Sequence, residues 1–447
     1  METPNKGDSR WGSLFKNDLQ GMLLPILLIT IIGSVNIFSA TYISSIYENT
    51  GLLGYFLKHM TFLLLSMAVG VILYRYDYRQ LQKPHMLQRI MIVTLIGMIL
   101  VLVIGAVING ARRWIVIGPV SIQPSEFAKL AALIWTAAKL STMRKWGKPR
   151  HINPLINLQG YFSERISYML PMLIWPTIFA GLTILQPDMG TTVLIFGFSF
   201  VLIYLAGFDG KFFGGAFVIA GFLGFIAARM SPYRWERIQS WFDPWPHAQD
   251  MGYQTVQGLL AVGSGGILGE GFMQGTSKYF YLPEAHTDFA FAVWAQEMGF
   301  IGAVFVVVLI AAFTYFGFRI SNKARDEFGK WLAMGITLLI SGQALFNIAM
   351  VCGIMPVTGV PLPFVSYGGS SLLMNFMAIG LLASIGRRNV EGVKPAGTAE
   401  PLPSLREETQ SRFKPAATTR TNKTNMPGPF KLRPSKKSTR RQTKFER

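Results

Sequence analysis

Long apolar segments separated by short polar connections dominate this chain. A helix needs around 20 apolar residues to cross about 30 Å of hydrocarbon. The pattern therefore predicts an all-α integral membrane protein with about ten transmembrane helices, of which the fourth is short and amphipathic. The segments are Met22–Ser44, Tyr55–Tyr74, Ile90–Ile108, Glu126–Leu140, Tyr168–Leu185, Thr191–Ala206, Phe212–Ala228, Phe291–Phe318, Trp331–Cys352 and Ser370–Ile385.

Charge in the connections predicts the orientation of these helices. Lys and Arg gather before the first segment and in the even-numbered connections, around residues 75–89, 144–150 and 319–330. Because cytoplasmic loops carry the excess of Lys and Arg, both termini are predicted to be cytoplasmic. The connection at about 230–290, between helices 7 and 8, is then a large extracytoplasmic loop. The predicted organisation is a cytoplasmic segment 1–20, a polytopic membrane domain 21–388 and a tail 389–447.

Composition supports the membrane assignment and explains the net charge. The 447 residues are 51% hydrophobic and 15% charged, whereas a soluble chain carries roughly a quarter charged residues. Residues 387–447 contain about 16 Lys and Arg against about 5 acids, which is over half of the net charge of +19. This Pro-, Thr- and Ser-rich tail is predicted to be disordered and to associate with anionic headgroups of the lipid bilayer. It lacks interleaved aromatic residues, so no nucleic-acid partner is expected.

Four polar stretches interrupt the apolar pattern on the predicted outer side. The first, NGARRWIVIGPVSIQPSE, spans Asn109–Glu126. Its adjacent Arg112 and Arg113 are typical of a phosphate clamp, because guanidinium groups bind phosphate oxygens bidentately; the alternative is a headgroup anchor. Glu126 and Lys129 are three residues apart at the start of a helix, so they are expected to form an ion pair that lowers the cost of burying either charge.

The next two stretches each place a carboxylate beside a helix. In QPDMGT, Asp188 either caps the following helix or takes part in function. In YLPEAHTDFAF, Glu284, His286 and Asp288 precede an apolar segment directly. Asp288 suits a helix N-terminus, but capping does not require His286, and ionisable groups at membrane depth are functional candidates.

The fourth stretch, GIMPVTGVPLPFVSYGGSS at Gly353–Ser371, has too many Pro and Gly residues for a spanning helix. Non-helical backbone at membrane depth is tolerated where it lines a cavity, so this stretch is predicted to form a cavity wall. No spacing of His and Cys residues suggests a metal site, and no nucleotide-binding Gly loop is present. The single cysteine, Cys352, excludes an internal disulfide.

Together, ARRWI…QPSE, QPD.GT, LPEAHTDF and GVPLPFVSYGGSS resemble the SEDS family of cell-wall polymerases, which includes RodA, FtsW and SpoVE. The resemblance covers about residues 24–388. The residues of the fourth stretch are more similar to those of the elongation members, RodA. The motif LPEAHTDF is equally typical of the division members, FtsW. One position departs from the family: a pair of glutamates often follows this motif, whereas this chain has Gln296 and Glu297.

The resemblance implies a peptidoglycan glycosyltransferase that polymerises lipid II outside the bacterial cytoplasmic membrane during elongation. It implies a class B penicillin-binding protein and the elongation machinery as partners. The essential acid of the family falls on Asp288, and the motif tryptophan, glutamate and lysine fall on Trp114, Glu126 and Lys129. We count the polar residues of the same motifs as substrate-binding candidates: Arg112, Arg113, Gln123, Ser125, Asp188, His286 and Ser366.

A single general base is sufficient for this reaction. A glycosidase keeps two carboxylates because its leaving group needs a proton, but diphosphate leaves without one. Asp288 would take the proton of the attacking hydroxyl, and Arg112 and Arg113 would stabilise the departing charge. One displacement of this kind inverts the anomeric centre. No cofactor or resident metal follows from the residues, although a divalent cation could neutralise the diphosphate.

Two other classes of function are compatible with these residues. Broken helices and buried charges also occur in transporters, so a lipid II flippase is one alternative. Transporters often show two related halves, and the sequence has no such internal repeat. A non-catalytic scaffold for division or elongation proteins is the other alternative.

Overall fold

The computed structural model describes residues 17–391, apart from short gaps at 48–50, 52, 109, 119, 144–156, 209, 231 and 280. The expectations for the segment 1–16, for the basic connection at 144–150 and for the tail 392–447 lie outside the described residues. The last helix runs to Glu391, so it continues three residues past the predicted end of the membrane domain at 388.

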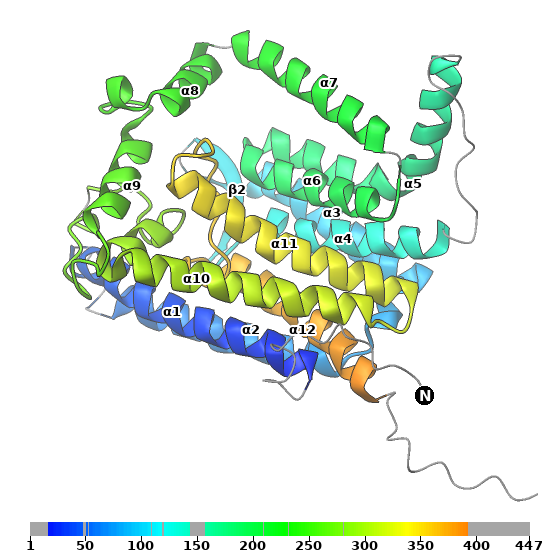
Figure 1. Ribbon diagram of the computed structural model, residues 1–447, viewed down its shortest axis with the longest axis horizontal. Helices are drawn as coiled ribbons and strands as arrows, with labels where there is room; N and C mark the ends of the chain where they lie inside the picture. Colours follow the sequence, from blue (N-terminus) through cyan, green and yellow to red (C-terminus); the bar gives the residue numbers. More distant parts are fainter. Residues whose placement is uncertain are drawn as a thin grey trace, which may run out of the picture. The chain divides into compact units, whose positions relative to one another are not determined.

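Helices make up most of the described chain (Figure 1), and each of the ten predicted segments contains one. The elements are α1 Asp18–Tyr47, α2 Gly54–Arg75, η2 Tyr78–Gln82, α3 Pro84–Ile104, β1 Ala106–Ile108, β2 Ala111–Ile117, β3 Val120–Ile122, α4 Pro124–Met143, α5 Leu158–Leu185, α6 Met189–Leu205, α7 Gly210–Arg229, α8 Pro232–Phe242, η4 Trp245–His247, α9 Tyr253–Ser264, α10 Ala290–Asn322, α11 Glu327–Val351 and α12 Gly369–Glu391.

Within the described residues, seven helices are long and apolar enough to cross a membrane: α1, α2, α3, α5, α10, α11 and α12. Two further apolar helical segments are shorter: α6, and the part Gly210–Ile219 of α7. Helix α4 carries Glu126, Lys129 and Lys139, which reduces its mean hydropathy. The number of ten spans therefore stays a prediction.

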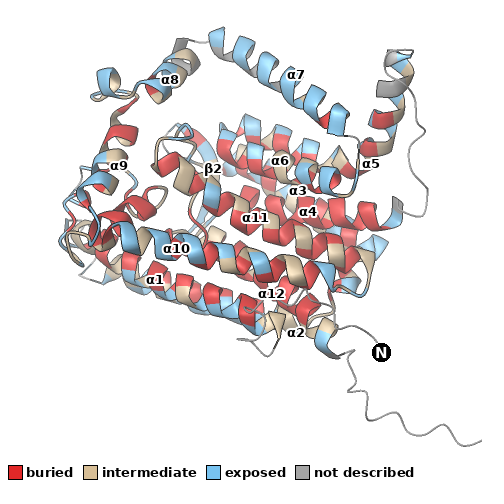
Figure 2. Cartoon of the chain, in the orientation of Figure 1, coloured by how far each residue is buried: buried red, intermediate tan, exposed pale blue. Residues whose placement is uncertain are grey.

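The helices differ in how much protein surrounds them. Helix α1 packs along α10, α2 along α12, and α11 against both α10 and α4. Buried residues are dense along α4, α11 and α12, whereas α7 is largely exposed (Figure 2). The exposed side chains of α7, such as Phe217 and Phe222, are apolar, as expected for a surface that contacts lipid rather than water.

A small antiparallel sheet lies between α3 and α4, where the sequence did not predict strands. Its order is β1-β2-β3, and the third predicted span ends in it, because residues 106–108 form β1. The strands are rich in Val and Ile, which favour extended backbone. Gly110 and Gly118 adopt φ of 75° and 60° between the strands, a conformation that glycine takes without strain in tight turns.

The long connection between α7 and α10 is anchored to a break in α10. Gly299 has φ 66° and ψ −168°, so the first turns of α10 are separated from the rest of the helix. The Gly-rich segment 265–271 packs at this break: Phe300 N donates to Gly266 O at 2.9 Å, and Glu270 N donates to Gln296 O at 3.0 Å. A Cβ on Gly269 would lie 2.1 Å from Glu297 O, so the close approach requires glycine. The Gly-rich segment thus pairs with backbone groups that the break leaves free.

Candidate active site

Asp288 lies at the end of the long connection, two residues before α10, and is half-buried. Helix α11 bonds to its backbone, and the stretch that follows α11 lies beside its carboxylate. The Asn347 side-chain amide on α11 donates to both Asp288 O and Val360 O at 2.7 Å. A Cβ placed on Gly359 would lie 3.4 Å from Asp288 Oδ2. The stretch 352–368 has no helix, which confirms the predicted break, and it forms one wall beside the carboxylate.

The environment of Asp288 favours its protonated form. The pKa of Asp288 is raised from 3.8 to about 7, mainly by burial and in addition by the negative charges of Glu284, Asp188 and Glu126. Arg113 acts in the opposite direction and lowers the pKa of this carboxyl group. Three of the four polar stretches therefore act electrostatically on the same side chain. A carboxyl group that titrates near neutrality is suited to accept a proton from a substrate hydroxyl.

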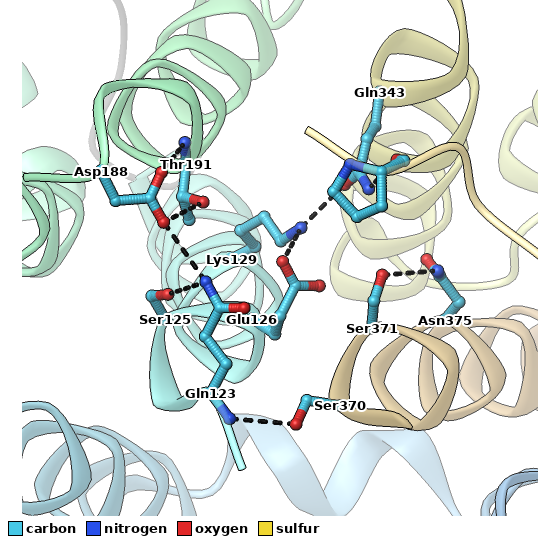
Figure 3. A network of polar contacts seen from close by, with 11 residues as sticks. Gln123, Ser125, Glu126, Lys129, Asp188, Thr191, Gln343, Ser370, Ser371 and Asn375 are labelled. Carbon is cyan, nitrogen blue, oxygen red and sulfur yellow. Dashed lines mark hydrogen bonds and ion pairs between the residues drawn. The ribbon is translucent and has the colours of Figure 1, made fainter. Parts of the chain in front are cut away.

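Asp188 is the N-cap of α6, as one of the two alternatives predicted (Figure 3). Its Oδ1 accepts a hydrogen bond from Thr191 N at 3.0 Å, and its Oδ2 accepts one from Thr191 Oγ1 at 2.8 Å. The Gln123 amide donates to Asp188 Oδ2 at 3.3 Å and to Ser125 Oγ at 3.2 Å. Gln123 N donates to Ser370 Oγ at 3.0 Å. These bonds join the first, second and fourth polar stretches.

Glu126 and Lys129 form the expected ion pair on α4, with 2.8 Å between Nζ and Oε1 and both side chains almost completely buried. Lys129 also donates to Gln343 Oε1 on α11 at 2.8 Å, and Gln343 Nε2 donates to Pro361 O at 2.9 Å. Within the described residues, the second carboxylate oxygen, Glu126 Oε2, has no hydrogen-bond partner. Figure 3 shows this oxygen pointing away from Lys129 toward the side of Ser371. The pair is thus buried but not fully satisfied.

The structure separates Arg112 from Arg113, which corrects the expectation that they act together as a clamp. Arg113 donates to the carbonyl oxygens of Gln186 (3.1 Å) and Pro187, directly before Asp188. Arg112 is exposed and donates instead to Leu102 O and Val103 O at the end of α3. The reason is the strand itself, because successive side chains in β2 point to opposite faces. Of these two arginines, Arg113 is the one that acts electrostatically on Asp288.

The remaining candidates lie in the same region with less direct contacts. Trp114 is half-buried on β2, opposite Ala106. The His286 ring lies 5.9 Å from the Tyr55 ring and 5.7 Å from the Tyr367 ring, and its carbonyl accepts a hydrogen bond from Tyr367 N. Ser366 Oγ accepts a hydrogen bond from Leu362 N at 2.8 Å. His286 therefore belongs to an aromatic cluster next to Asp288, while Ser366 shapes the non-helical wall.

Sequence reasoning missed two residues of this site, Gln343 and Asn347. Both are completely buried amides on α11, and they connect Lys129 and Asp288 to the non-helical wall. A signal was present: amides four residues apart lie on one face of a helix, and polar groups within an apolar span tend to face the protein interior. No group of three or more His, Cys, Asp or Glu in the described residues could hold a metal ion.

Comparison with known proteins places this arrangement among cell-wall enzymes. The family model of the cell cycle proteins FtsW, RodA and SpoVE matches residues 20–391. The chain is 32% identical over 374 residues to the probable peptidoglycan glycosyltransferase FtsW of Bacillus subtilis strain 168, covering 81% of this chain and 89% of the relative.

Two solved structures are also similar. One comes from work on the structural coordination of polymerization and crosslinking by a peptidoglycan synthase complex, with a TM-score of 0.65 and 27% identity over 83% of this chain and 98% of the other. The crystal structure of the rod shape determining protein RodA from Thermus thermophilus gives a TM-score of 0.57 and 26% identity, over 84% and 99% of the two chains. The helical fold is therefore shared along nearly the whole membrane domain.

Proposed function

We propose a reaction and a cellular role for this chain, which belongs to the FtsW/RodA/SpoVE family of cell cycle proteins and is a multi-pass membrane peptidoglycan glycosyltransferase. Its substrate is lipid II, the undecaprenyl-linked disaccharide pentapeptide. The enzyme joins these units into glycan strands at the outer face of the cytoplasmic membrane. Asp288 is the general base. The observation that carries this assignment is the half-buried Asp288 carboxyl group, whose pKa lies near 7 beside Arg113.

The reaction is one displacement at the anomeric carbon. Asp288 takes the proton from a sugar hydroxyl of one substrate, and the oxygen attacks the anomeric carbon of the other substrate as its bond to diphosphate breaks. The electron pair of that bond leaves with the diphosphate, so no general acid is needed and the anomeric centre is inverted. Loss of a proton to a positioned carboxylate contributes about 10²–10⁴-fold to the rate of such reactions.

Arg113 and Lys129 supply the positive charge for the departing diphosphate. Arg113 is held by the carbonyl groups that precede Asp188, and Lys129 is held by Glu126 and Gln343. Cations fixed before the reaction stabilise developing charge without having to reorganise. Arg112, which the strand turns to the other side, takes no part in this step.

An apolar cavity next to the site suits the polyprenyl tail of a substrate. It has a volume of about 680 Å³ and lies among α3, α4 and α12, with Ile115, Ile122 and Pro124 in its lining. Pro124 directly follows Gln123, so the cavity adjoins the polar end of α4. A lipid-linked substrate needs this juxtaposition, because its headgroup reacts while its tail stays in an apolar environment.

The cellular role follows the resemblance. We place elongation first, with a class B penicillin-binding protein and the elongation machinery as partners and with both termini in the cytoplasm. The structure from the peptidoglycan synthase complex supports a crosslinking partner. A division role is the second candidate, because relatives of this chain carry the name FtsW. A fluorescent fusion separates them: sidewall signal supports elongation, and signal confined to the septum supports division.

Asp288→Asn tests the reaction. The variant is purified with its transpeptidase partner, supplied with lipid II, and its glycan products are separated on a gel. We expect polymerisation to fall at least about 10²-fold while the complex stays intact. The matched control is Glu284→Gln, which removes an exposed carboxylate four residues earlier in the same segment and should retain polymerisation. Unchanged polymer from Asp288→Asn would refute the assigned base. A flippase or scaffold would form no polymer even with the original residue.

A further inference from the structure

A second buried ion pair lies outside the proposed reaction. Lys278, in the long connection, places Nζ 2.7 Å from Glu297 Oε1 on α10, and both side chains are almost completely buried. Ser39 on α1 donates to the same Glu297 oxygen at 2.6 Å and accepts from Lys278 Nζ at 3.0 Å. These three residues, called the anchor cluster below, bond to one another across three segments of the chain.

Gln296 reinforces the anchor cluster from the adjacent position. Its Oε1 accepts a hydrogen bond from Ser277 N at 3.2 Å, and its Nε2 donates to Thr276 Oγ1 at 3.1 Å. Consecutive residues of α10 therefore hold consecutive residues of the connection. The segment closed in this way runs from Lys278 to Glu297, and Asp288 lies ten residues after its beginning and nine before its end.

Because of the break at Gly299, the position of the first turns of α10 depends on contacts with other segments. An unbroken α10 would fix its first turns through the rest of the helix, but Gly299 adopts φ 66° and interrupts it. The short piece before the break, which begins two residues after Asp288, must be positioned by other contacts. Asn36 on α1 donates to Ala290 O at 2.8 Å, and the anchor cluster adds a second tie to α1 about two helical turns further on.

The chemistry of the cluster suits positioning better than stability alone. Burying two charges costs several kcal/mol of desolvation, and apolar residues of similar size often stabilise a buried site as well or better. An ion pair bonded by a hydroxyl group, in contrast, accepts only one arrangement of its three partners. The anchor cluster thus fixes how the connection meets α10.

We propose that Lys278, Glu297 and Ser39 are positioning residues that hold the segment 281–289 in place and thereby set the Asp288 carboxylate toward Arg113. The inference rests on the proposed function, because it takes Asp288 as the base. None of the three residues is expected to touch the substrate, so their effect falls on the rate of the chemical step rather than on lipid II binding.

The test uses the full-length protein with its transpeptidase partner and the double variant Lys278→Met/Glu297→Leu, which removes both charges together. We expect kcat for glycan polymerisation to fall about tenfold or more, with KM for lipid II within about twofold. The pH midpoint of the rate should also fall, because a looser segment admits water to Asp288 and relieves its burial. A loss of folded protein alone would lower kcat without moving this midpoint.

Asp18→Asn is the matched control. Asp18 bonds to Arg319 at 3.0 Å and to Lys323 at 2.7 Å, so it ties the same helices, α1 and α10, at their other end. That end is about 30 Å from Ser39 along the helix axis. This variant should keep kcat and the pH midpoint.

If the double variant does not fold, the single variant Ser39→Ala tests the positioning role, because it removes a hydroxyl group and leaves the ion pair in place. It should lower kcat about two- to fivefold with KM unchanged. Full kcat and an unchanged pH midpoint in a folded double variant, or in Ser39→Ala, overturn the positioning role. The two proposals can be refuted separately. Polymerisation by Asp288→Asn would refute Asp288 as the base. If Asp288→Asn is inactive but the cluster variants keep full activity, only the positioning role of the anchor cluster is refuted.

Discussion

The two buried ion pairs of this membrane domain differ in range and in completeness. Glu126 and Lys129 are three residues apart on one helix, and one carboxylate oxygen of the pair has no hydrogen-bond partner among the described residues. Lys278 and Glu297 are 19 residues apart, join two segments, and share Ser39 as a third partner. Each pair has a third partner, Gln343 in the first and Ser39 in the second. The first pair also has a buried carboxylate oxygen without a hydrogen bond from the described part of the chain, and such an oxygen is a point where a ligand can bond. We therefore assign the first pair to the proposed site and the second to its proposed support.

The largest expected difference between the pairs appears when each is replaced by apolar residues. Glu126→Leu/Lys129→Met should reduce polymerisation about 10²–10³-fold, because a fixed cation next to the departing diphosphate is lost. Lys278→Met/Glu297→Leu should reduce it about tenfold. Both proteins should melt close to the original temperature, since removing both charges leaves no unpaired one. Polymerisation assays with melting curves check this, and equal losses in the two variants would contradict the division of roles.

A second test addresses the departure from the family at Gln296. The Gln296 amide donates to Ser264, Glu270 and Thr276, so Gln296→Glu removes these donors and adds a negative charge beside Glu270. We expect the variant to lose about 1–3 kcal/mol of stability, the cost of leaving buried polar groups without partners. Chemical denaturation or melting curves measure the loss.

A second substitution, Glu270→Gln, provides the control, because it should restore part of the stability that Gln296→Glu loses. Glu270→Gln on its own should change stability little, while combined with Gln296→Glu it returns an amide donor to the contact and should recover part of the loss. A Gln296→Glu protein as stable as the original would show that the amide is not needed. In that case the glutamate pair common in the family would fit this chain without a compensating change.

The smallest expected effect is a shift in the pH midpoint of the rate, and it separates the two arginines of β2. The polymerisation rate should rise with pH and reach half its maximum near pH 7, because the base must be ionised and the pKa of Asp288 is about 7. Arg113 lowers the pKa of Asp288, so Arg113→Gln should move the midpoint upward. The loss of this cation beside the diphosphate also lowers the maximal rate, but it does not move the midpoint.

The neighbouring residue serves as the control for charge. Arg112→Gln removes the same charge from the opposite face of the strand and should leave the midpoint where it is. Glu284→Gln should move the midpoint downward, because Glu284 raises the pKa of Asp288. Rates of lipid II polymerisation between pH 5.5 and about 8.5 distinguish the three variants. Equal shifts from Arg112→Gln and Arg113→Gln would contradict the separation seen in the structure.

The sequence by itself determined the features that depend on neighbours a few residues away. Hydropathy located a helix in each of the ten predicted segments, the Asp188 cap follows from one residue before α6, and the Glu126–Lys129 pair follows from helical spacing. The Pro and Gly content of the stretch before α12 predicted its non-helical course. Each of these depends on local backbone geometry, which a short stretch of sequence specifies.

Only the tertiary structure decided the contacts between distant segments. Side chains alternate between the two faces of β2, so Arg112 and Arg113 lie on opposite faces. The sequence did not predict this separation, because it did not predict the strand. Helix packing provides the partners of three groups: Gln343, Asn347 and the Lys278–Glu297 pair. It also brings the Gly-rich segment 265–271 to the break in α10. The physical reason is that a buried polar group must find a partner wherever packing brings one within reach, and the distance along the chain does not specify that partner.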